Sequence, residues 1–346
     1  MAVLQLLEEL ADARCYPGAA AAAPKVEIVQ THLSVVCLVG DRVYKLKKAR
    51  RLPFVDFTGL DRRRAACRDE VRLNRRLCPT VYLGTAALRR HAEGLRFAEL
   101  GDDVGAADLD VAVVMQRLPA GRMLDVLLAE QRVTPAEIEA LARLVATFHA
   151  GAERGPEVIA AGSPRRLAEY AAANFTELSR IPGHGLPAPL LAALARRSAA
   201  AFAALLPTLE RRSAAHIVDG HGDLHARNVC LTKPPVVYDC IEFEPSFRCG
   251  DVATENAFLV MDLRYRAAAR LARVYVDAYV AASGDREMVA LLPVLAAYRA
   301  VVRAKVTALA AAEPELSDAD RDGARGSSRR HLLLAAVLLI EAGPPL

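Results

Sequence analysis

The sequence predicts an α+β fold with two lobes, a small antiparallel β lobe followed by a larger, mostly helical lobe. Residues 29–118 contain short apolar and β-branched runs separated by turn-forming residues, as in strands joined by hairpins. After Pro119, apolar residues recur every three or four positions over long stretches, which is typical of packed helices. The 346 residues suffice for both lobes. We therefore expect an N-terminal helix with a flexible segment (1–28), an N-terminal lobe (29–118) and a C-terminal lobe (119–346).

The β lobe is expected to begin with a hairpin and to carry one helix. The runs SVVCLV and RVYKLKK flank Gly40 and Asp41, and a glycine in the first place of a two-residue loop suits a type II′ turn. Thr58 is predicted to cap a helix over 61–77. Its inward face has residues three and four positions apart, namely Cys67, Glu70, Leu73 and Leu77. Further strands are expected at 80–88, 95–100 and 110–119, with loops at 89–94 and 101–109 between them.

The second lobe is predicted to be built from helices. Their periodic stretches begin at a proline, a glycine or a glutamate and cover 135–150, 164–178, 187–210, 250–283 and 287–312. The apolar run Leu332–Ile340 is expected to form a buried C-terminal helix. Only two pieces are strand-like, at 228–232 and 236–243.

Composition and charge narrow the classes of function. The seven cysteines are scattered and odd in number, with no Cys-x-x-Cys, so we expect reduced thiols in a cytoplasmic protein. The start has no basic leader, and the longest apolar run is about half of what a bilayer crossing needs, so no membrane role is expected. Basic residues are not interleaved with aromatic ones, which argues against nucleic-acid binding.

The net charge of +4 is unevenly distributed. Residues 1–100 contain 18 Lys and Arg against 11 Asp and Glu, whereas residues 101–346 have a net charge of −3. An anionic ligand in the first lobe and a cationic ligand in the second would suit this division. Ordinary solvated helix faces would produce it equally well.

One short stretch, HGDLHARN, gathers side chains that handle protons and metals. It places Asp223 two residues after His221 and five residues before Asn228. Protein kinases use the same spacing in their catalytic loop, where the aspartate takes the proton of the acceptor hydroxyl and the asparagine binds the metal. Eleven residues after Asn228, Asp239 follows a strand-like run, where a second metal-binding carboxylate is expected.

These motifs resemble the aminoglycoside phosphotransferase and choline kinase branch of the protein-kinase-like superfamily. The runs HLSVVCLVGDRVYKLKK, VVMQRLP and DCIEFEPSFRCGDVA look more like one bacterial group, in which such a module often precedes a P-loop ATP-binding domain. No G-x-x-x-x-G-K-[ST] occurs here, so we expect the phosphotransferase-like module alone. The resemblance covers about residues 29–310.

The resemblance implies an ATP-dependent small-molecule kinase with Mg²⁺, with GTP as an alternative nucleotide. Asp223 would be the catalytic base, and Asn228 and Asp239 the metal ligands, with Glu242 as a rival to Asp239. His221 would brace the loop, while His225 would either contact substrate or fill space. Asp251 is expected to be a helix cap or a strut for the catalytic loop.

The nucleotide lysine has to be chosen between Lys45 and Lys47. Alternate residues of a strand share a face, and the residue two before the lysine lies against the adenine in kinases. Val43 suits that position before Lys45, whereas a charged residue would occupy it before Lys47. We therefore choose Lys45, with Glu70 as its ion-pair partner and the opening β lobe as the nucleotide-binding lobe.

The adenine edge and the phosphates need further groups. The segment 113–119 is expected to link the lobes, with backbone groups of Met115, Gln116 and Arg117 facing the adenine. The turn THLS lacks the glycines of a protein-kinase phosphate loop. Related small-molecule kinases manage with backbone amides and a hydroxyl, and Ser34 could supply the hydroxyl here.

Three alternatives remain open from the sequence. A metallohydrolase would use His216, His221 and His225, but their spacings of five and four lack the helix-borne pair with a general-base glutamate. A degenerate kinase would bind a nucleotide or a partner and transfer nothing. A protein kinase is disfavoured because only a short segment follows Asp239 before the next helix. The acceptor is expected to be a sugar, an amino sugar or an amino alcohol, and the oligomeric state stays undetermined.

Overall fold

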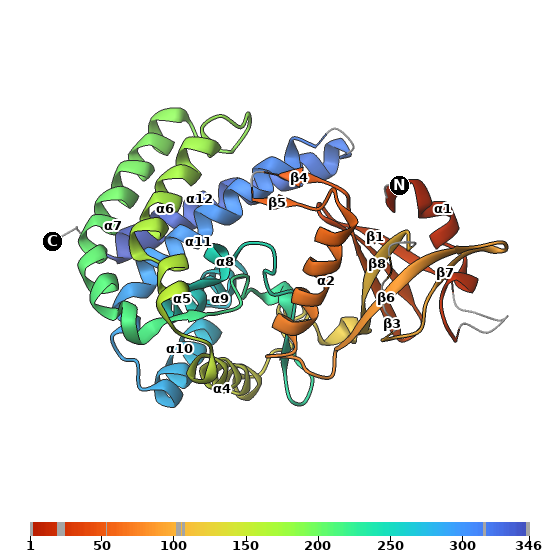
Figure 1. Cartoon of the computed structure of the whole chain (residues 1–346). Coiled ribbons are helices and arrows are strands. Elements are labelled where there is room, and N and C mark those ends of the chain that lie inside the picture. Colours follow the sequence, from red (N-terminus) through yellow and green to blue (C-terminus); the bar gives the residue numbers. More distant parts are fainter. Residues whose placement is uncertain are drawn as a thin grey trace. The chain divides into compact units, whose positions relative to one another are not determined.

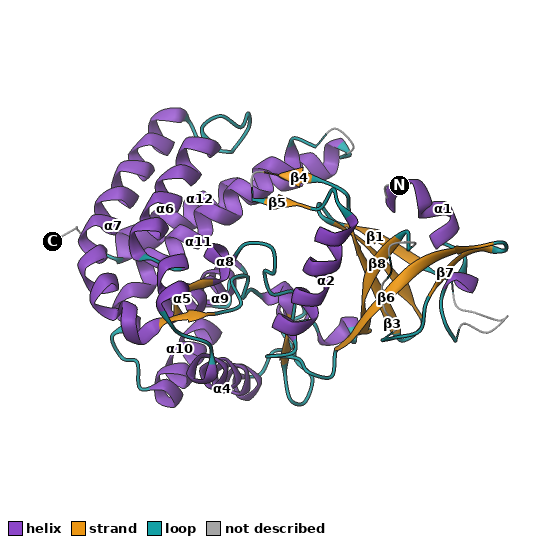
Figure 2. Ribbon diagram, in the orientation of Figure 1, coloured by secondary structure: helices purple, strands orange, loops and turns teal. Residues whose placement is uncertain are grey.

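The computed structural model describes residues 3–18, 25–52, 54–101, 105, 108–313 and 316–343. The chain divides into two compact units. Unit 1 contains Met1–Arg122 and Val236–Glu244, and unit 2 contains Met123–Pro235 and Pro245–Leu346. Strands dominate the first unit and helices the second, which is the two-lobed α+β architecture that the sequence predicts (Figure 2). The segment 236–244 belongs to the first unit although it lies far along the chain.

A six-stranded antiparallel sheet forms the centre of unit 1. Its strand order is β1-β2-β3-β8-β6-β7. The strands are β1 (Glu27–Gln30), β2 (Ser34–Val39), β3 (Arg42–Lys47), β6 (Tyr82–His91), β7 (Gly94–Phe97) and β8 (Asp110–Gln116). Two shorter strands, β4 (Arg51–Leu52) and β5 (Val55–Asp56), pair with each other. A further short strand, β11 (Val236–Val237), comes from the distant segment.

The first hairpin is confirmed. Val39 pairs with Arg42 across the turn, and Gly40 has a φ of +57°, as the first position of a type II′ turn requires. The expected loop at 89–94 is wrong in part, because β6 continues to His91 and pairs there with Gly94. Most of the flexible segment expected at 17–24, and most of the loop at 101–109, lie outside the described residues.

Side chains of the sheet alternate between two differently covered faces. Tyr44 and Leu46 point into an apolar core that also contains Leu10 and Tyr16 of the N-terminal segment. That segment forms short helical turns, η1 (Val3–Leu6), α1 (Leu7–Leu10) and η2 (Ala13–Cys15). Helix α2 (Leu60–Asn74) lies on the other side of the sheet (Figure 1). The intervening residues of β3 therefore face α2.

Helix α2 buries the face that the sequence predicts, but it begins differently. Cys67, Glu70 and Leu73 are each at most 1% exposed. The predicted cap is wrong, because Gly59 occupies the N-cap position and makes no side-chain hydrogen bond. Thr58 instead donates its hydroxyl to Asp56 at 2.6 Å.

Unit 2 is a helical assembly with one small two-stranded ladder. Its helices are α3 (Leu124–Ala129), α4 (Pro135–Gly151), α5 (Pro156–Ala161), α6 (Pro164–Leu178), α7 (Ala188–His216), α8 (Pro245–Arg248), α9 (Val252–Tyr265), α10 (Ala269–Ser283), α11 (Met288–Ala311) and α12 (Asp318–Glu341). Strand β9 (Ile217–Asp219) pairs with β12 (Cys249–Asp251). Two short pieces, η4 (Ala226–Asn228) and β10 (Val229–Cys230), follow β9, and η3 (Ala120–Arg122) ends the first part of unit 1.

Two expectations for the helices need correction. The helix predicted over 250–283 is two helices, α9 and α10, because Ala267 takes a left-handed φ of +60° between them. The C-terminal helix is only half buried: Leu332 is fully buried, but Leu333 is 48% and Ile340 is 68% exposed. The reason is that α12 packs one face against α11 and leaves its other face open.

The cysteines and one long helix complete the description. All seven cysteines fall in the described part of the chain, where each is buried and none forms a disulfide. Among the described helices, α7 is long and apolar enough to cross a bilayer by length and composition alone. Core helices and signal sequences pass the same test.

Candidate active site

Lys45 and Glu70 form an ion pair in unit 1, as the sequence predicts. The Lys45 ammonium donates to Glu70 Oε1 at 2.8 Å and to Asp239 Oδ1 at 2.5 Å. Lys45 lies on β3, Glu70 on α2, and Asp239 comes from the segment 236–244. Residues 194 positions apart in the sequence therefore meet at one ammonium group.

Lys47 takes part in the same network, which the sequence reasoning missed. Its ammonium donates to Glu70 Oε2 and to Glu242 Oε1, and the side chains of these three residues are 3%, 0% and 6% exposed. Five groups thus alternate in charge, Asp239, Lys45, Glu70, Lys47 and Glu242; we call them the lysine–carboxylate cluster. The two-residue spacing on β3 was the available signal, because it places both lysines on the same face of the strand. It was used only to choose one of them as the nucleotide lysine.

The cluster keeps its central groups ionised. Burial would raise the pKa of Glu70, but Lys45 and Lys47 together lower it to about 2. Burial would lower the pKa of Lys45, yet Asp239 and Glu70 hold it well above the ordinary value. At neutral pH, Glu70 is therefore a carboxylate that accepts from two ammonium groups.

Asp239 is held in place through its backbone and keeps its side chain accessible. Its φ is +65°, a left-handed conformation that aspartate tolerates better than most residues. Its N–H donates to the hydroxyl of the buried Tyr82 at 3.2 Å, and the next N–H, of Cys240, donates to Asn74 Oδ1 at 2.9 Å. The side chain is 44% exposed, and no described residue donates to its Oδ2. Glu242, by contrast, is buried and bonded to Lys47.

The remaining predicted nucleotide-binding residues lie on the same sheet. Ser34 pairs directly with Lys47 and Val43 lies two residues before Lys45, so both share the lysines' face. Ser34 is only 2% exposed and Val43 is 8% exposed. Met115 pairs with Val43 in the neighbouring strand.

The expected adenine-binding segment has some of its donors already used. The N–H of Gln116 donates to the Val81 carbonyl at 2.8 Å, and the N–H of Arg117 donates to the Asp41 carbonyl at 2.7 Å. These two donors serve the sheet and the first hairpin. A base bound at this segment would need other backbone groups.

Asp223 and Asn228 meet in unit 2, in the loop after β9. Asn228 Nδ2 donates to Asp223 Oδ2 at 2.9 Å and to the Asp223 carbonyl at 3.0 Å. This bond turns the amide so that Asn228 Oδ1 points elsewhere, and no described residue donates to that oxygen. The spacing of five that the sequence shows thus corresponds to a direct contact.

His225 is a second donor to the same carboxylate oxygen. Its Nε2 lies 3.3 Å from Asp223 Oδ2, while its Nδ1 accepts from the Arg227 N–H at 3.2 Å. Because Nδ1 accepts, the ring has its proton on Nε2, facing Asp223. Burial would raise the pKa of Asp223, but His225, followed by Arg303 and His221, lowers it well below the usual range. Among the described residues, none donates to Oδ1, and the Asp223 side chain is 31% exposed.

Glu255 of α9 braces this loop, and the sequence reasoning missed it. Its Oε2 accepts from the N–H groups of His221 and Gly222 at 2.7 and 3.2 Å. His149 Nε2 lies 3.1 Å from Oε1, and its Nδ1 lies 2.8 Å from the Tyr279 hydroxyl. A lone glutamate within the apolar run of α9 was the available signal. His221 Nδ1 in turn accepts from the Asp223 N–H at 3.2 Å, which matches the bracing contact expected of it.

The glycine of HGD is needed for close approach. Gly222 has a φ of +83°, and a Cβ there would lie 2.7 Å from the Phe247 carbonyl oxygen. A Cβ on Gly220 would collide with the Glu255 carboxylate. Asp251, expected as a cap or a strut, does cap α9 by accepting from the Ala253 N–H at 2.8 Å. The strut for the loop is Glu255.

Replacing Glu255 by glutamine should lower stability in a pH-dependent way. Burial would raise the pKa of Glu255, but His149 and the loop amides lower it to about 2, below the ordinary 4.5. The ionised group therefore stabilises the fold above about pH 4.5, and this contribution is lost as the pH falls towards 2. The variant should lose up to about 3 kcal/mol of unfolding free energy at pH 7, with the difference shrinking between pH 5 and 3. Urea unfolding measures this.

The control for that experiment is Glu177→Gln, which changes an exposed glutamate of unit 2. We expect only a small change in unfolding free energy there, because an exposed ion pair contributes little. A Glu255→Gln variant as stable as the wild type from pH 3 to 7 would contradict the bracing role.

Each unit contains one oxygen of the type that a hard cation prefers, and we consider the two separately. The described residues contain no group of three or more His, Cys, Asp or Glu side chains able to hold a metal. Mg²⁺ bound with a nucleotide does not need one, because waters and phosphate oxygens complete its shell. Asp239 Oδ2 and Asn228 Oδ1, one in each unit, are oxygens without a described donor. Glu242 fits poorly, because it is buried and bonded to Lys47.

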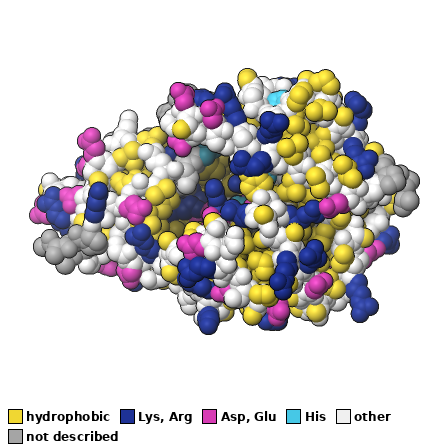
Figure 3. Space-filling model, turned by 180° about the vertical axis from the view of Figure 1, so that it is seen from behind, with side chains coloured by type: hydrophobic (Ala, Val, Ile, Leu, Met, Phe, Trp, Pro, Cys, Tyr) yellow, Lys and Arg dark blue, Asp and Glu magenta, His cyan; other side chains and the backbone are white. Residues whose placement is uncertain are grey.

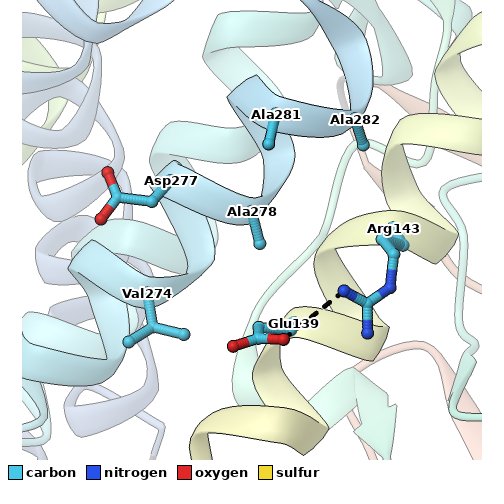
Figure 4. Close-up of a pocket in the computed structure, with 7 residues that line it drawn as sticks. All are labelled: Glu139, Arg143, Val274, Asp277, Ala278, Ala281 and Ala282. Carbon is cyan, nitrogen blue, oxygen red and sulfur yellow. Dashed lines mark hydrogen bonds and ion pairs between the residues drawn. The ribbon is translucent and has the colours of Figure 1, made fainter.

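The surface of unit 2 has one open pocket of about 480 Å³ that contains none of these residues. It lies between α4 and α10 (Figure 4) and is lined by Glu139, Arg143, Val274, Asp277, Ala278, Ala281 and Ala282. Glu139 and Arg143 pair with each other across 3.5 Å while both stay exposed. On the face drawn in Figure 3, basic and acidic side chains are interspersed with hydrophobic ones.

The chain is similar in sequence to curated proteins and in fold to solved structures. Uncharacterized proteins of Mycobacterium tuberculosis and Mycobacterium bovis are 30% identical over 320 residues, which cover 90% of this chain and 59% of theirs. The chain thus spans about three-fifths of the length of these curated relatives. A choline/ethanolamine kinase family protein from Mesorhizobium loti has a TM-score of 0.51 at 16% identity, covering 95% of this chain and 98% of that one.

A second solved structure is the GDP complex of aminoglycoside 2′-phosphotransferase-IIIa, with a TM-score of 0.50 at 13% identity over 93% of both chains. At these identities the likeness shows the two-lobed, kinase-like fold. The model of the phosphotransferase enzyme family matches residues 40–292, which is well over half of the chain. The protein therefore belongs to the phosphotransferase enzyme family.

Proposed function

We propose that the protein transfers the γ-phosphate of ATP, bound with Mg²⁺, to a hydroxyl group of a small molecule. The observation that carries the proposal is the Asp223–Asn228 contact. It leaves one carboxylate oxygen open for a proton and one amide oxygen open for a metal. The seven cysteines, all described, are buried and form no disulfide, which suits the reducing cytoplasm where ATP is supplied.

Asp223 is proposed as the general base. Donors from Asn228 and His225 occupy Oδ2 and fix the plane of the carboxylate. Oδ1 is then directed at the acceptor hydroxyl and takes its proton as the oxygen attacks. The lowered pKa keeps Asp223 ionised at neutral pH, so it is ready to accept.

Lys45, Asp239 and Asn228 are proposed to hold the nucleotide. When bound, Mg²⁺ would neutralise charge on the transferring phosphoryl group. Asp239 Oδ2 and Asn228 Oδ1 are the oxygens that would hold the ion. Lys45, already ionised by its carboxylate neighbours, would contact the phosphates. Positioning and charge neutralisation would supply most of the rate gain.

The acceptor is proposed to be an alcohol that also carries an amine. Proteins of similar fold include a choline/ethanolamine kinase family protein and an aminoglycoside 2′-phosphotransferase. A net charge of −3 over residues 101–346 favours a cationic acceptor over an anionic one.

A panel experiment tests the proposal. Purified protein with Mg²⁺ and ATP, or GTP in parallel, is incubated with choline, ethanolamine, aminoglycosides, sugars and amino sugars. Mass spectrometry should detect one acceptor class that gains a phosphate, with matching release of ADP or GDP. Nucleotide binding without a phosphorylated product from any acceptor would contradict the proposal and favour a binding module.

Replacing Lys45 by methionine should weaken nucleotide binding much more than folding. A charge-assisted bond to phosphate contributes about 1.5–3 kcal/mol, so the affinity for Mg²⁺ with AMP-PNP should fall roughly 10- to 100-fold. The fold should tolerate the change because Lys47 still donates to Glu70. Isothermal titration and thermal melting measure the two effects, and an unchanged affinity would contradict the role of Lys45.

A further inference from the structure

The second lysine of the cluster has no role in the proposed reaction, yet it is the more deeply buried one. Lys47 has a side chain 3% exposed, compared with 14% for Lys45. It lies between two carboxylates, Glu70 and Glu242, and its ammonium is 5.5 Å from the centre of the Phe57 ring. This arrangement should be rigid. Moving any one of the three groups away would leave a buried charge without its partner, which is unfavourable.

The contacts connect two lysines of β3 with two carboxylates of the segment 236–244. Lys45 and Lys47 lie two residues apart on β3, and Asp239 and Glu242 lie three apart in the segment 236–244. Each lysine bonds one of these two carboxylates, and both lysines bond Glu70. The segment is therefore attached to β3 at two points. Together with the backbone bonds of Asp239 and Cys240, these two attachments fix the direction of the segment.

Only one of the two attachments can persist when a nucleotide binds. In the proposed reaction, Lys45 turns to phosphate and Asp239 to the metal, so their mutual bond weakens. Glu70 would then lose one of its two cationic partners. The contacts of Lys47 with Glu70 and Glu242 are separate from the nucleotide groups and remain.

We propose that Lys47 and Glu242 form a positioning pair that fixes Asp239 for metal binding. Lys47 also balances the negative charge of Glu70 while Lys45 contacts the nucleotide. The inference rests on the proposed function. It assigns Glu242 to Lys47 rather than to the metal. Residues that orient metal ligands typically change metal affinity about 10- to 100-fold when they are replaced.

The test uses Lys47→Met, Glu242→Gln and the double variant. The control is Arg63→Met, which removes a buried ion pair of the same helix α2, Arg63 with Asp110 at 2.8 Å, outside the cluster. Two quantities are measured on each full-length variant. One is the melting temperature without ligand, and the other is the Mg²⁺ concentration that gives half-maximal binding of AMP-PNP.

Lys47→Met should lower the melting temperature and raise the half-maximal Mg²⁺ concentration at least about tenfold. The double variant should melt higher than Lys47→Met alone, because the unpaired Glu242 carboxylate is gone, but should keep the raised Mg²⁺ requirement. Arg63→Met should lower the melting temperature and leave the Mg²⁺ requirement within about twofold of the wild type.

Two results would overturn the inference. Additive losses of melting temperature for positions 47 and 242 would show that they do not act as a pair. Coupled melting with an unchanged Mg²⁺ requirement would reduce the pair to a structural contact. If the wild-type protein binds no AMP-PNP with Mg²⁺, the proposed function is refuted instead. The melting temperatures without ligand would then still show whether positions 47 and 242 act as a pair.

Discussion

Asp223→Asn should reduce phosphate transfer about a thousandfold while the protein stays folded, because general-base catalysis contributes about 10²- to 10⁴-fold. The substitution keeps the shape of the side chain and an oxygen that can accept from Asn228 and His225. It removes the negative charge that accepts the proton of the acceptor hydroxyl. The loss should therefore appear in kcat, with little change in nucleotide affinity.

The measurement uses whichever acceptor the panel identifies, with steady-state kinetics and thermal melting on the same preparations. Asp277→Asn is a matched control, since it makes the same change at an exposed position on α10. That control should have wild-type kinetics. An Asp223→Asn variant that retains more than about a tenth of the wild-type rate would exclude Asp223 as the base.

Asp239→Asn should remove most Mg²⁺-dependent turnover, by about 10²- to 10³-fold. Asparagine tolerates the left-handed φ of +65° at this position, so the backbone should keep its shape. The neutral amide is a weaker ligand for a hard cation than a carboxylate is. Lys45 keeps its bond to Glu70, so the melting temperature should change little.

The activity of this variant is measured over a wide range of Mg²⁺ concentrations. Partial recovery at high Mg²⁺ is expected, because the site is weakened rather than blocked. An unchanged Mg²⁺ dependence would show that Asp239 does not bind the metal, and Glu242→Gln would then be the variant to compare.

Much of the fold follows from local patterns in the sequence. The hairpin at Gly40, the buried face of α2 and most helices of unit 2 have a period or a turn residue that identifies them. The errors have tertiary causes. The break at Ala267 and the continuation of β6 to His91 depend on neighbouring elements. The open face of α12 depends on what packs against it.

The residues of the candidate site also fall into those that local sequence identifies and those that only the tertiary structure reveals. His221, Asp223 and Asn228 lie close together in the sequence, and their spacing identified them. His149 comes from a helix far from the loop in the sequence, and nothing local distinguishes it from other buried helix residues, whereas Glu255 is distinguished only by its charge within an apolar helix. Lys47 was rejected as the nucleotide lysine because that choice would place the charged Lys45 against the adenine.

The central proposal is that Asn228 and Asp239 hold one nucleotide-bound Mg²⁺, that Lys45 contacts the phosphates and that Asp223 takes the proton of the acceptor hydroxyl. A crystal structure of the protein with Mg²⁺, AMP-PNP and the identified acceptor tests it most directly. The account predicts Asn228 and Asp239 oxygens at about 2.0–2.1 Å from the metal. It also predicts Lys45 at the phosphates, and the acceptor hydroxyl within about 3.2 Å of Asp223. A nucleotide bound with its metal held by other residues, or with Asp223 far from the acceptor, would contradict it.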